Sequence, residues 1–277
     1  MNRRQRLLVD RFGLDYGRMR RFGAIAAAAL LAAAIPLNAN EITQEQRRSG
    51  YSFMGPDTRA MQDDDTSNPG MLFVLDGEAL WNKKTGSVDK ACADCHGDAR
   101  ESMKGVAAHY PAFDKTLGRP VTIEQRINLE RARHQEAQPL AYESRDLLAL
   151  AAFIVNQSRG MPIVAGDDPD LKPFLDKGRD LFMQRQGQLN LACTNCHDEN
   201  WNKRLAGSPV TQAHPTGYPI YRLEWQTLGS LKRRLRSCIT GVRAQTWDYG
   251  APELVELELY LMSRARGMKL ETPAVRP

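Results

Sequence analysis

The pentapeptide pattern C-x-x-C-H occurs twice in this chain, and it limits the possible folds more than any other feature. The copies are CADCH at 92–96 and CTNCH at 193–197. In each copy, two thiols about one helical turn apart match the two attachment points of one porphyrin, and the adjacent histidine can ligate its iron. The residues predicted to hold haem in this way are Cys92, Cys95, His96, Cys193, Cys196 and His197.

Paired cysteines also occur in disulfides, zinc knuckles and thioredoxin-like dithiols. A zinc site requires four close ligands, and thioredoxin-like motifs lie in βαβ surroundings that this sequence does not predict. None of the three explains why histidine follows the second cysteine both times, in a chain with only 5 Cys and 5 His. The motifs therefore predict two covalently bound haem c groups, with His96 and His197 as iron ligands.

The first 39 residues are typical of a secretory signal peptide. An arginine-rich start precedes an alanine-rich apolar run at 23–37, and we expect cleavage near Ala39. The run is short for a stable membrane span, although an uncleaved anchor is the alternative. The true start is either Met1 or Met19, because a normal signal also begins at Met19. Export and haem attachment together predict the bacterial periplasm.

Charge gives little further information about partners. The formal net charge of +5 includes the arginine-rich signal, so it overstates the charge of the mature chain. The sequence contains no nucleic-acid-binding motif, and we therefore predict no nucleic-acid partner.

The mature chain is predicted to contain an internal repeat. The motifs are 193 − 92 = 101 positions apart, and the same offset relates GEALW at 77–81 to GRDLF at 178–182. Further along, YESRDL at 142–147 resembles YGAPEL at 249–254, now at an offset of 107. We therefore expect an insertion of six residues between motif and helix in the second copy, with each copy running helix, motif, loop, helix, helix.

Strand alternation is scarce, so the repeat predicts an all-α fold of two tandem cytochrome c-like domains after a cleaved signal peptide. Within the second domain, His214 is interpreted as an ordinary exposed loop residue. The predicted organisation is a signal peptide at 1–39, an N-terminal extension at 40–70, a first domain at 71–162 and a second, catalytic domain at 170–277.

The fifth cysteine, Cys238, lies outside both motifs. A helix predicted over 228–245 places it on one apolar face with leucines and a valine, where a haem would lie, so it is a candidate iron ligand. Arg234 lies one turn earlier on the same side. A cationic setting favours a thiolate and attracts a small anion; alternatively, Cys238 is an inert core thiol and the arginines form a solvated face. The other cationic residues of this stretch are Lys232, Arg233, Arg236 and Arg243.

The first copy differs at the matching positions. Arg126 aligns with Arg234, but Glu130 falls where Cys238 lies. Because carboxylate is a poor ligand for low-spin haem, three alternatives stay open. Glu130 ligates weakly, the site is open or holds water, or His134, one turn further along, substitutes. More remote candidates are Met103 and His109.

The tandem motifs, the segment RLRSC at 234–238 and APE at 251–253 with its apolar helix resemble SoxA, a family of dihaem subunits of the SoxAX cytochromes of bacterial sulfur oxidation. The resemblance covers nearly all of the mature chain. It implies an L-cysteine S-thiosulfotransferase in which Cys238 ligates the second haem and carries the sulfur intermediate, while Arg234 binds substrate. Dihaem members usually have a second cysteine where Glu130 lies.

The resemblance also implies partners. Thiosulfate would be joined oxidatively to a cysteine of a sulfur-carrier protein (SoxYZ-like), and the electrons would pass to a monohaem cytochrome c subunit (SoxX-like) in a heterodimer. Two other classes compete: a dihaem electron carrier, in which Cys238 is dispensable, and a dihaem peroxidase, which needs an open haem. The spacing of Arg234 and Cys238 favours the thiosulfotransferase.

Overall fold

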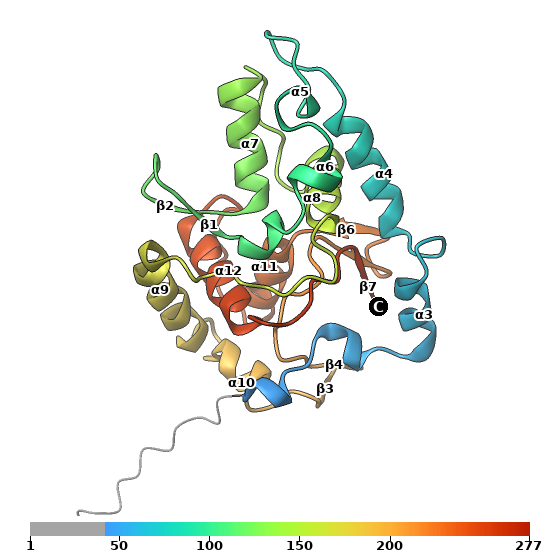
Figure 1. The fold of residues 1–277 in the computed structure, drawn as a ribbon. Helices are drawn as coiled ribbons and strands as arrows, with labels where there is room; N and C mark the ends of the chain where they lie inside the picture. The colour runs from blue at the N-terminus through green and yellow to red at the C-terminus, as the bar shows by residue number, and fades with distance from the viewer. Residues whose placement is uncertain (1–41) are drawn as a thin grey trace, which may run out of the picture. The chain divides into compact units, whose positions relative to one another are not determined.

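Two helix pairs form the frame of the molecule (Figure 1). The computed structural model describes residues 42–277, so the predicted signal peptide, with its cleavage site and start, lies outside the described residues. We call the segment from α4 to α8 the first repeat and the segment from α9 to α12 the second repeat. The paired helices are α4 (Gly70–Trp81) with α8 (Arg145–Asn156), and α9 (Lys172–Met183) with α12 (Pro252–Arg264).

The helices of each pair meet at a glycine. A Cβ atom added to Gly77 would lie 2.2 Å from the Ala149 carbonyl oxygen, and one added to Gly178 would lie 2.1 Å from the Glu256 carbonyl oxygen. The two glycines are 101 positions apart and the two carbonyls 107 apart, which are the offsets found in the sequence. The predicted internal repeat therefore has the same helix-on-helix contact in both copies.

Replacing Gly178 by alanine is expected to destabilise the protein by about 1–3 kcal/mol, because the new methyl group overlaps a backbone carbonyl that cannot move freely. Urea unfolding of the haem-loaded protein measures this loss. Gly55→Ala is the control, since a Cβ there meets nothing within 4 Å. Equal stability of the two variants would contradict the close approach of α9 and α12.

The two motifs form short helices, and equivalent loops precede them in the chain. These helices are α5 (Ala93–His96) and α10 (Cys193–His197). Isolated bridges join Thr85 to Lys90 before the first and Gln186 to Leu191 before the second, again 101 positions apart. Gly86 and Gly187 have positive φ values of 75° and 67°, a conformation that side chains disfavour. The loops that present the two motifs therefore have the same shape.

A third helix in each repeat follows a short hairpin. Thr122 and Ser230 cap these helices by accepting the backbone N–H groups of Gln125 and Arg233. The predicted helix over 228–245 is too long at both ends. Ser230 is the cap, so the helix begins at Leu231 and ends at Gly241, and Leu228 lies in a strand. The elements are β1 (Ala112–Asp114), β2 (Arg119–Val121) and α7 (Ile123–His134), then β5 (Ile220–Arg222), β6 (Thr227–Gly229) and α11 (Leu231–Gly241).

The fold is mainly helical, as predicted, and its short strands were not predicted, because runs of two or three residues are too short to show alternation. The two hairpins are 108 positions apart, so the second repeat gains its extra residues between its motif and β5. That interval contains a small hairpin of β3 (Arg204–Leu205) and β4 (Ser208–Pro209), whereas the first repeat has α6 (Ala99–Ser102) and η3 (Val106–His109).

Both ends of the described chain pack against the second repeat. Strand β7 (Ala274–Arg276) pairs in parallel with β5, giving a three-stranded sheet in the order β6-β5-β7. Helix α3 (Pro56–Asp63) lies against β7, and Gln62 Oε1 accepts the Val275 backbone N–H at 3.1 Å. Residues 42–277 pack as one compact unit, so the limits of the two predicted domains stay predictions. The remaining 3₁₀ turns are η1 (Gln44–Gln46), η2 (Gly50–Phe53) and η4 (Pro169–Leu171).

No helix among residues 42–277 is both long enough and apolar enough to cross a membrane.

Candidate functional site

The second motif holds its histidine in an orientation suited to iron. The His197 Nδ1–H donates to the Thr211 carbonyl oxygen at 2.6 Å, which leaves Nε2 free for a metal. Burial lowers the pKa of His197, and the positive charge of Arg234 lowers it further, so the imidazole stays neutral. Neutral imidazole is the form that ligates a metal.

Helix α11 faces this motif. Cys193 packs against the apolar cluster to which Leu235 and Ile239 of α11 belong. Burial raises the pKa of Cys193 to about 11, and a charge on Cys238 raises it further. Burial and Cys238 also raise the pKa of Cys196. The structure thus brings Cys238, predicted from the spacing on its helix, close to both cysteines of the second motif.

Several arginines lie on the elements around Cys238 and the second motif. Arg222, on β5, has a side chain only 15% exposed, and burial and then the charge of Arg234 lower its pKa. Two more arginines of α11 lie over aromatic rings: Arg233 is 4.1 Å from the Trp225 centroid, and Arg236 is 4.7 Å from that of Tyr249. Within residues 42–277, Arg234 has no carboxylate partner, so its guanidinium is available to an anion.

Lys232 does not belong to this cationic surface, contrary to the prediction. Its side chain is 1% exposed, and its Nζ donates to Thr122 Oγ1 at 2.7 Å and to Glu124 Oε2 at 3.3 Å. A signal in the sequence was available, because 232 − 124 = 108, the offset of the two hairpins. Lys232 and Glu124 are thus equivalent positions of the two repeats with opposite charges.

The interpretation of His214 as an exposed loop residue is wrong. Its side chain is 8% exposed, its Nδ1–H donates to the Arg48 carbonyl at 2.9 Å, and burial lowers its pKa to about 4. The neighbouring Gln212 is fully buried, and its amide bridges the Gln46 carbonyl and the Arg48 backbone N–H. The N-terminal extension therefore fixes the segment whose Thr211 carbonyl orients His197.

The first motif has different surroundings. Trp81 Nε1 donates to the Gly97 carbonyl at 3.1 Å, and its ring centroid lies 5.7 Å from that of His96. Burial raises the pKa of Cys92, and Gln135 Nε2 lies 3.8 Å from its Sγ. Gln135 caps the C-terminal end of α7, so this helix reaches the first motif as α11 reaches the second.

Glu130 occupies the position of Cys238 on α7, but ion pairs hold it. Its carboxylate lies 3.3 Å from Arg126 Nη1 and 3.4 Å from His134 Nε2. Arg126 in turn donates to the buried Asp114 at 2.8 Å. Two of the candidate ligands of the first haem thus contact each other, and the choice among Glu130, His134 and water stays a prediction.

The residues at both motifs suit a covalently attached haem. All five cysteines are free thiols, each pair sits on one turn of helix, and the His197 ring is already oriented by its second nitrogen. No disulfide competes for the thiols among the described residues. The chemistry of this donor set is that of haem c.

Comparison with known proteins agrees with this site. The family model described as SoxA/TsdA, cytochrome c domain matches residues 76–163 and 177–270, more than half of the chain, and cytochrome c domains carry haem c. The L-cysteine S-thiosulfotransferase subunit SoxA of Rhodovulum sulfidophilum is 38% identical over 84% of this chain and 81% of its own length. The SoxA subunit of Pseudaminobacter salicylatoxidans is also 38% identical, over 82% of this chain and 80% of its own.

A solved structure gives the same result for the fold. A chain in the crystal structure of SoxXA from P. pantotrophus superposes with a TM-score of 0.81 and 30% identity, covering 83% of this chain and 87% of that one. The mainly helical architecture and the two-part family match thus both agree with SoxA proteins. The chain belongs to the SoxA family, the cytochrome c subunits of L-cysteine S-thiosulfotransferase.

Proposed function

We propose that this subunit carries two haem c groups and performs sulfur transfer at the second. Cys92, Cys95 and His96 hold the first haem, and the matching residues 193, 196 and 197 hold the second. Cys238 would help to hold the second haem as a ligand of its iron and would carry the sulfur, and Arg234 would bind the substrate. The substrate is thiosulfate, a small dianion for which a guanidinium fork is well suited.

The observation that carries this proposal is the position of Cys238. Its charge acts on Cys193 and Cys196, while Arg234, one turn earlier on α11, acts on His197. A thiol and an unpaired guanidinium therefore share one side of a helix that faces the histidine of the motif. The matching helix of the first repeat presents Glu130 in ion pairs, which offers no sulfur nucleophile.

The chemistry balances with these residues. The Cys238 thiolate bonds to the outer sulfur of thiosulfate as two electrons leave, and Arg234 neutralises the anion that approaches it. A thiolate of a carrier protein then attacks that outer sulfur, takes the S–SO₃ group and releases Cys238 as thiolate. The haem groups supply the one-electron acceptors for the electrons released.

This function requires two protein partners. One is a monohaem cytochrome c (SoxX-like) that forms a heterodimer with this chain and accepts the electrons, as the SoxXA name of the structural relative suggests. The other is a sulfur-carrier protein (SoxYZ-like) that presents its cysteine to Cys238. Covalent haem attachment and the signal-like N-terminus support the periplasm as the location.

Replacing Arg234 by alanine is expected to raise the KM for thiosulfate by roughly 10- to 100-fold, because a charge-assisted contact to the dianion is lost. Steady-state kinetics of conjugation at varied thiosulfate concentration measures the change. Arg243→Ala is the matched control, because that exposed arginine follows the end of α11. An unchanged KM in Arg234→Ala would remove this residue from the binding role.

A further inference from the structure

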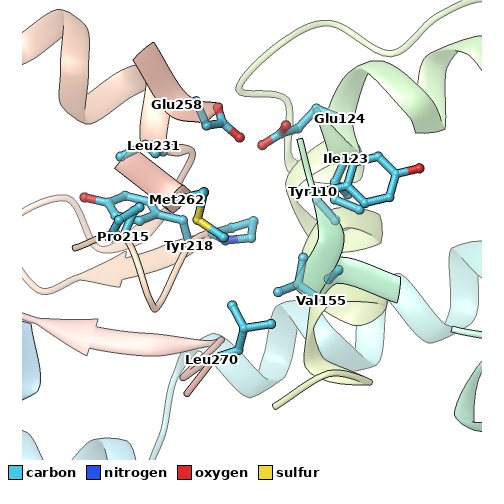
Figure 2. Close-up of a pocket in the computed structure, with 13 residues that line it drawn as sticks. Tyr110, Ile123, Glu124, Val155, Pro215, Tyr218, Leu231, Glu258, Met262 and Leu270 are labelled. Atoms are coloured by element: carbon cyan, nitrogen blue, oxygen red, sulfur yellow. The ribbon is translucent and has the colours of Figure 1, made fainter. Parts of the chain in front are cut away.

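A buried cluster of three charged side chains joins the two repeats. Lys232 of α11 lies 3.3 Å from Glu124 Oε2 of α7 and 3.6 Å from Glu258 Oε2 of α12. Figure 2 shows the carboxylates of Glu124 and Glu258 directed toward each other from opposite sides of a cavity. The side chains of Lys232, Glu124 and Glu258 are only 1%, 9% and 14% exposed.

The repeat makes this cluster asymmetric. Glu124 and Lys232 are equivalent positions, and together they form a neutral pair across the interface. Glu258 is equivalent to Ala151, since 258 − 151 = 107, the offset of α8 and α12. Glu258 thus adds a second carboxylate that the first repeat lacks, and the cluster has one more acid than base.

One carboxylate oxygen of Glu258 lacks a hydrogen-bond donor among residues 42–277. Its Oε2 is buried and accepts no hydrogen bond from the described part of the chain, because the 3.6 Å separation from Lys232 Nζ is too long for one. Lys232 instead donates to Thr122 and Glu124, which have the shorter contacts. A buried carboxylate oxygen without a donor is costly, and protonation relieves that cost.

The charged and hydroxyl groups near Glu258 come from several elements that pack against α12. Burial raises the pKa of Glu258 to about 7, Lys232 lowers it, and Glu124 raises it. Tyr110 and Tyr218 line the same cavity, which has a volume of about 40 Å³ and space for a water molecule. The ring of Tyr142 lies 5.7 Å from Lys232 Nζ. On the other elements packed against α12, Lys177 of α9 pairs with Glu256 and Arg119 of β2 donates to the Pro120 carbonyl.

We propose that Glu258 is a proton-binding site that takes up one proton when the neighbouring haem groups are reduced and releases it when they are oxidised. Lys232 precedes Cys238 by six residues on α11, and Glu124 precedes Glu130 by six on α7, about 9 Å along each helix. Lys232 and Glu124 therefore lie about one and two-thirds turns before Cys238 and Glu130 on their helices. Low-dielectric surroundings transmit a change of charge over such a distance.

The step balances in charge and atoms. A haem held by these motifs would supply the acceptor for one electron. The Glu258 carboxylate takes one proton from water in response, and the net charge of the cluster changes from −1 to 0. Thiosulfate conjugation supplies the electrons and returns a proton to the solvent, because joining thiosulfate to a thiol releases two electrons and one proton. The small exposed fraction of Glu258 gives that proton a route from solvent, whereas Lys232 has none. This inference rests on the proposed attachment of haem to both motifs.

The test compares reduced-minus-oxidised infrared difference spectra of the haem-loaded full chain between pH 6 and 8. Reduction is expected to produce a protonated-carboxyl C=O band that shifts in deuterium oxide and is lost in Glu258→Gln. The haem midpoint potentials are expected to fall as pH rises across this range, and to do so less in the variant. Glu256→Gln is the matched control: this glutamate lies on the same helix, is also buried and faces Lys177 on α9.

Two results would overturn the inference. One is a carboxyl band that persists in Glu258→Gln but disappears in Glu256→Gln, and the other is a pH dependence of the potentials that is the same in all three proteins. The proposed sulfur chemistry can be contradicted independently of the proton site. If Cys238→Ala still conjugates thiosulfate while the carboxyl band depends on Glu258, the proton site stands and the catalytic role of Cys238 does not.

Discussion

Replacing Cys238 by alanine is expected to lower thiosulfate-dependent conjugation by roughly three orders of magnitude or more, because the residue that carries the sulfur is gone. Cys92, Cys95, Cys193 and Cys196 are untouched, so haem content should be unchanged. Conjugation to a carrier-protein cysteine is measured in the presence of a monohaem cytochrome, and haem content is measured by pyridine haemochrome absorbance. The low-spin thiolate signal in the electron paramagnetic resonance spectrum should disappear at the same time.

The control for this variant is Ser237→Ala, which changes an exposed side chain next to Cys238 on the same helix. It should keep full activity and the thiolate signal. Retained turnover in Cys238→Ala would show that this chain transfers electrons without carrying sulfur. A thiolate signal that survives in Cys238→Ala would assign the ligand to another residue.

Replacing Lys232 by methionine is expected to cost about 3–5 kcal/mol of folding free energy, since it leaves two carboxylates buried without a cation. For a chain of this size, the melting temperature should fall by roughly 10 °C. The loss should be largest at pH 8, where Glu258 is charged. It should shrink toward pH 5, because protonation of a carboxyl whose pKa is raised to about 7 removes one of the repelling charges. Urea unfolding across this pH range measures both effects.

Lys172→Met is the control for this substitution. Lys172 pairs with Asp176 at 2.8 Å on the surface of α9, with a side chain 74% exposed, and its loss should cost less than about 1 kcal/mol. Adding Glu124→Gln and Glu258→Gln to the Lys232 variant should restore most of the stability, because no buried charge then remains. Equal losses in the two single lysine variants would contradict a buried cluster between the repeats.

The residues proposed for haem attachment and catalysis follow from local sequence. The C-x-x-C-H motifs are short, and the spacing of Arg234 and Cys238 is one turn of α11, so both depend only on the local chain. The repeat also follows from the sequence, because Gly77 and Gly178 mark the same helix crossing. These features need no knowledge of how distant segments meet.

The supporting half of the site could not be predicted in that way. Lys232 was predicted to be part of a cationic surface, since every neighbouring arginine of α11 is at least partly exposed. Its burial depends on partners far away in the sequence, such as Glu124, 108 residues earlier. His214 depends on a backbone carbonyl of Arg48, 166 residues away. Every residue has a backbone carbonyl, so the sequence does not indicate which carbonyl accepts a hydrogen bond. The contact of His197 with the Thr211 carbonyl could therefore not be predicted.

The position of β7 has a consequence for the order in which the molecule is assembled. The helices that surround the first motif, α4, α7 and α8, all precede residue 157. The sheet beside Arg222, by contrast, lacks a strand until residues 274–276 have been synthesised. A chain made from its N-terminus therefore contains these three helices well before it contains the strand that completes the sheet. Cys238 and the arginines proposed to act with it have their full surroundings only after residues 274–276 are made, so the proposed sulfur-transfer site is assembled last.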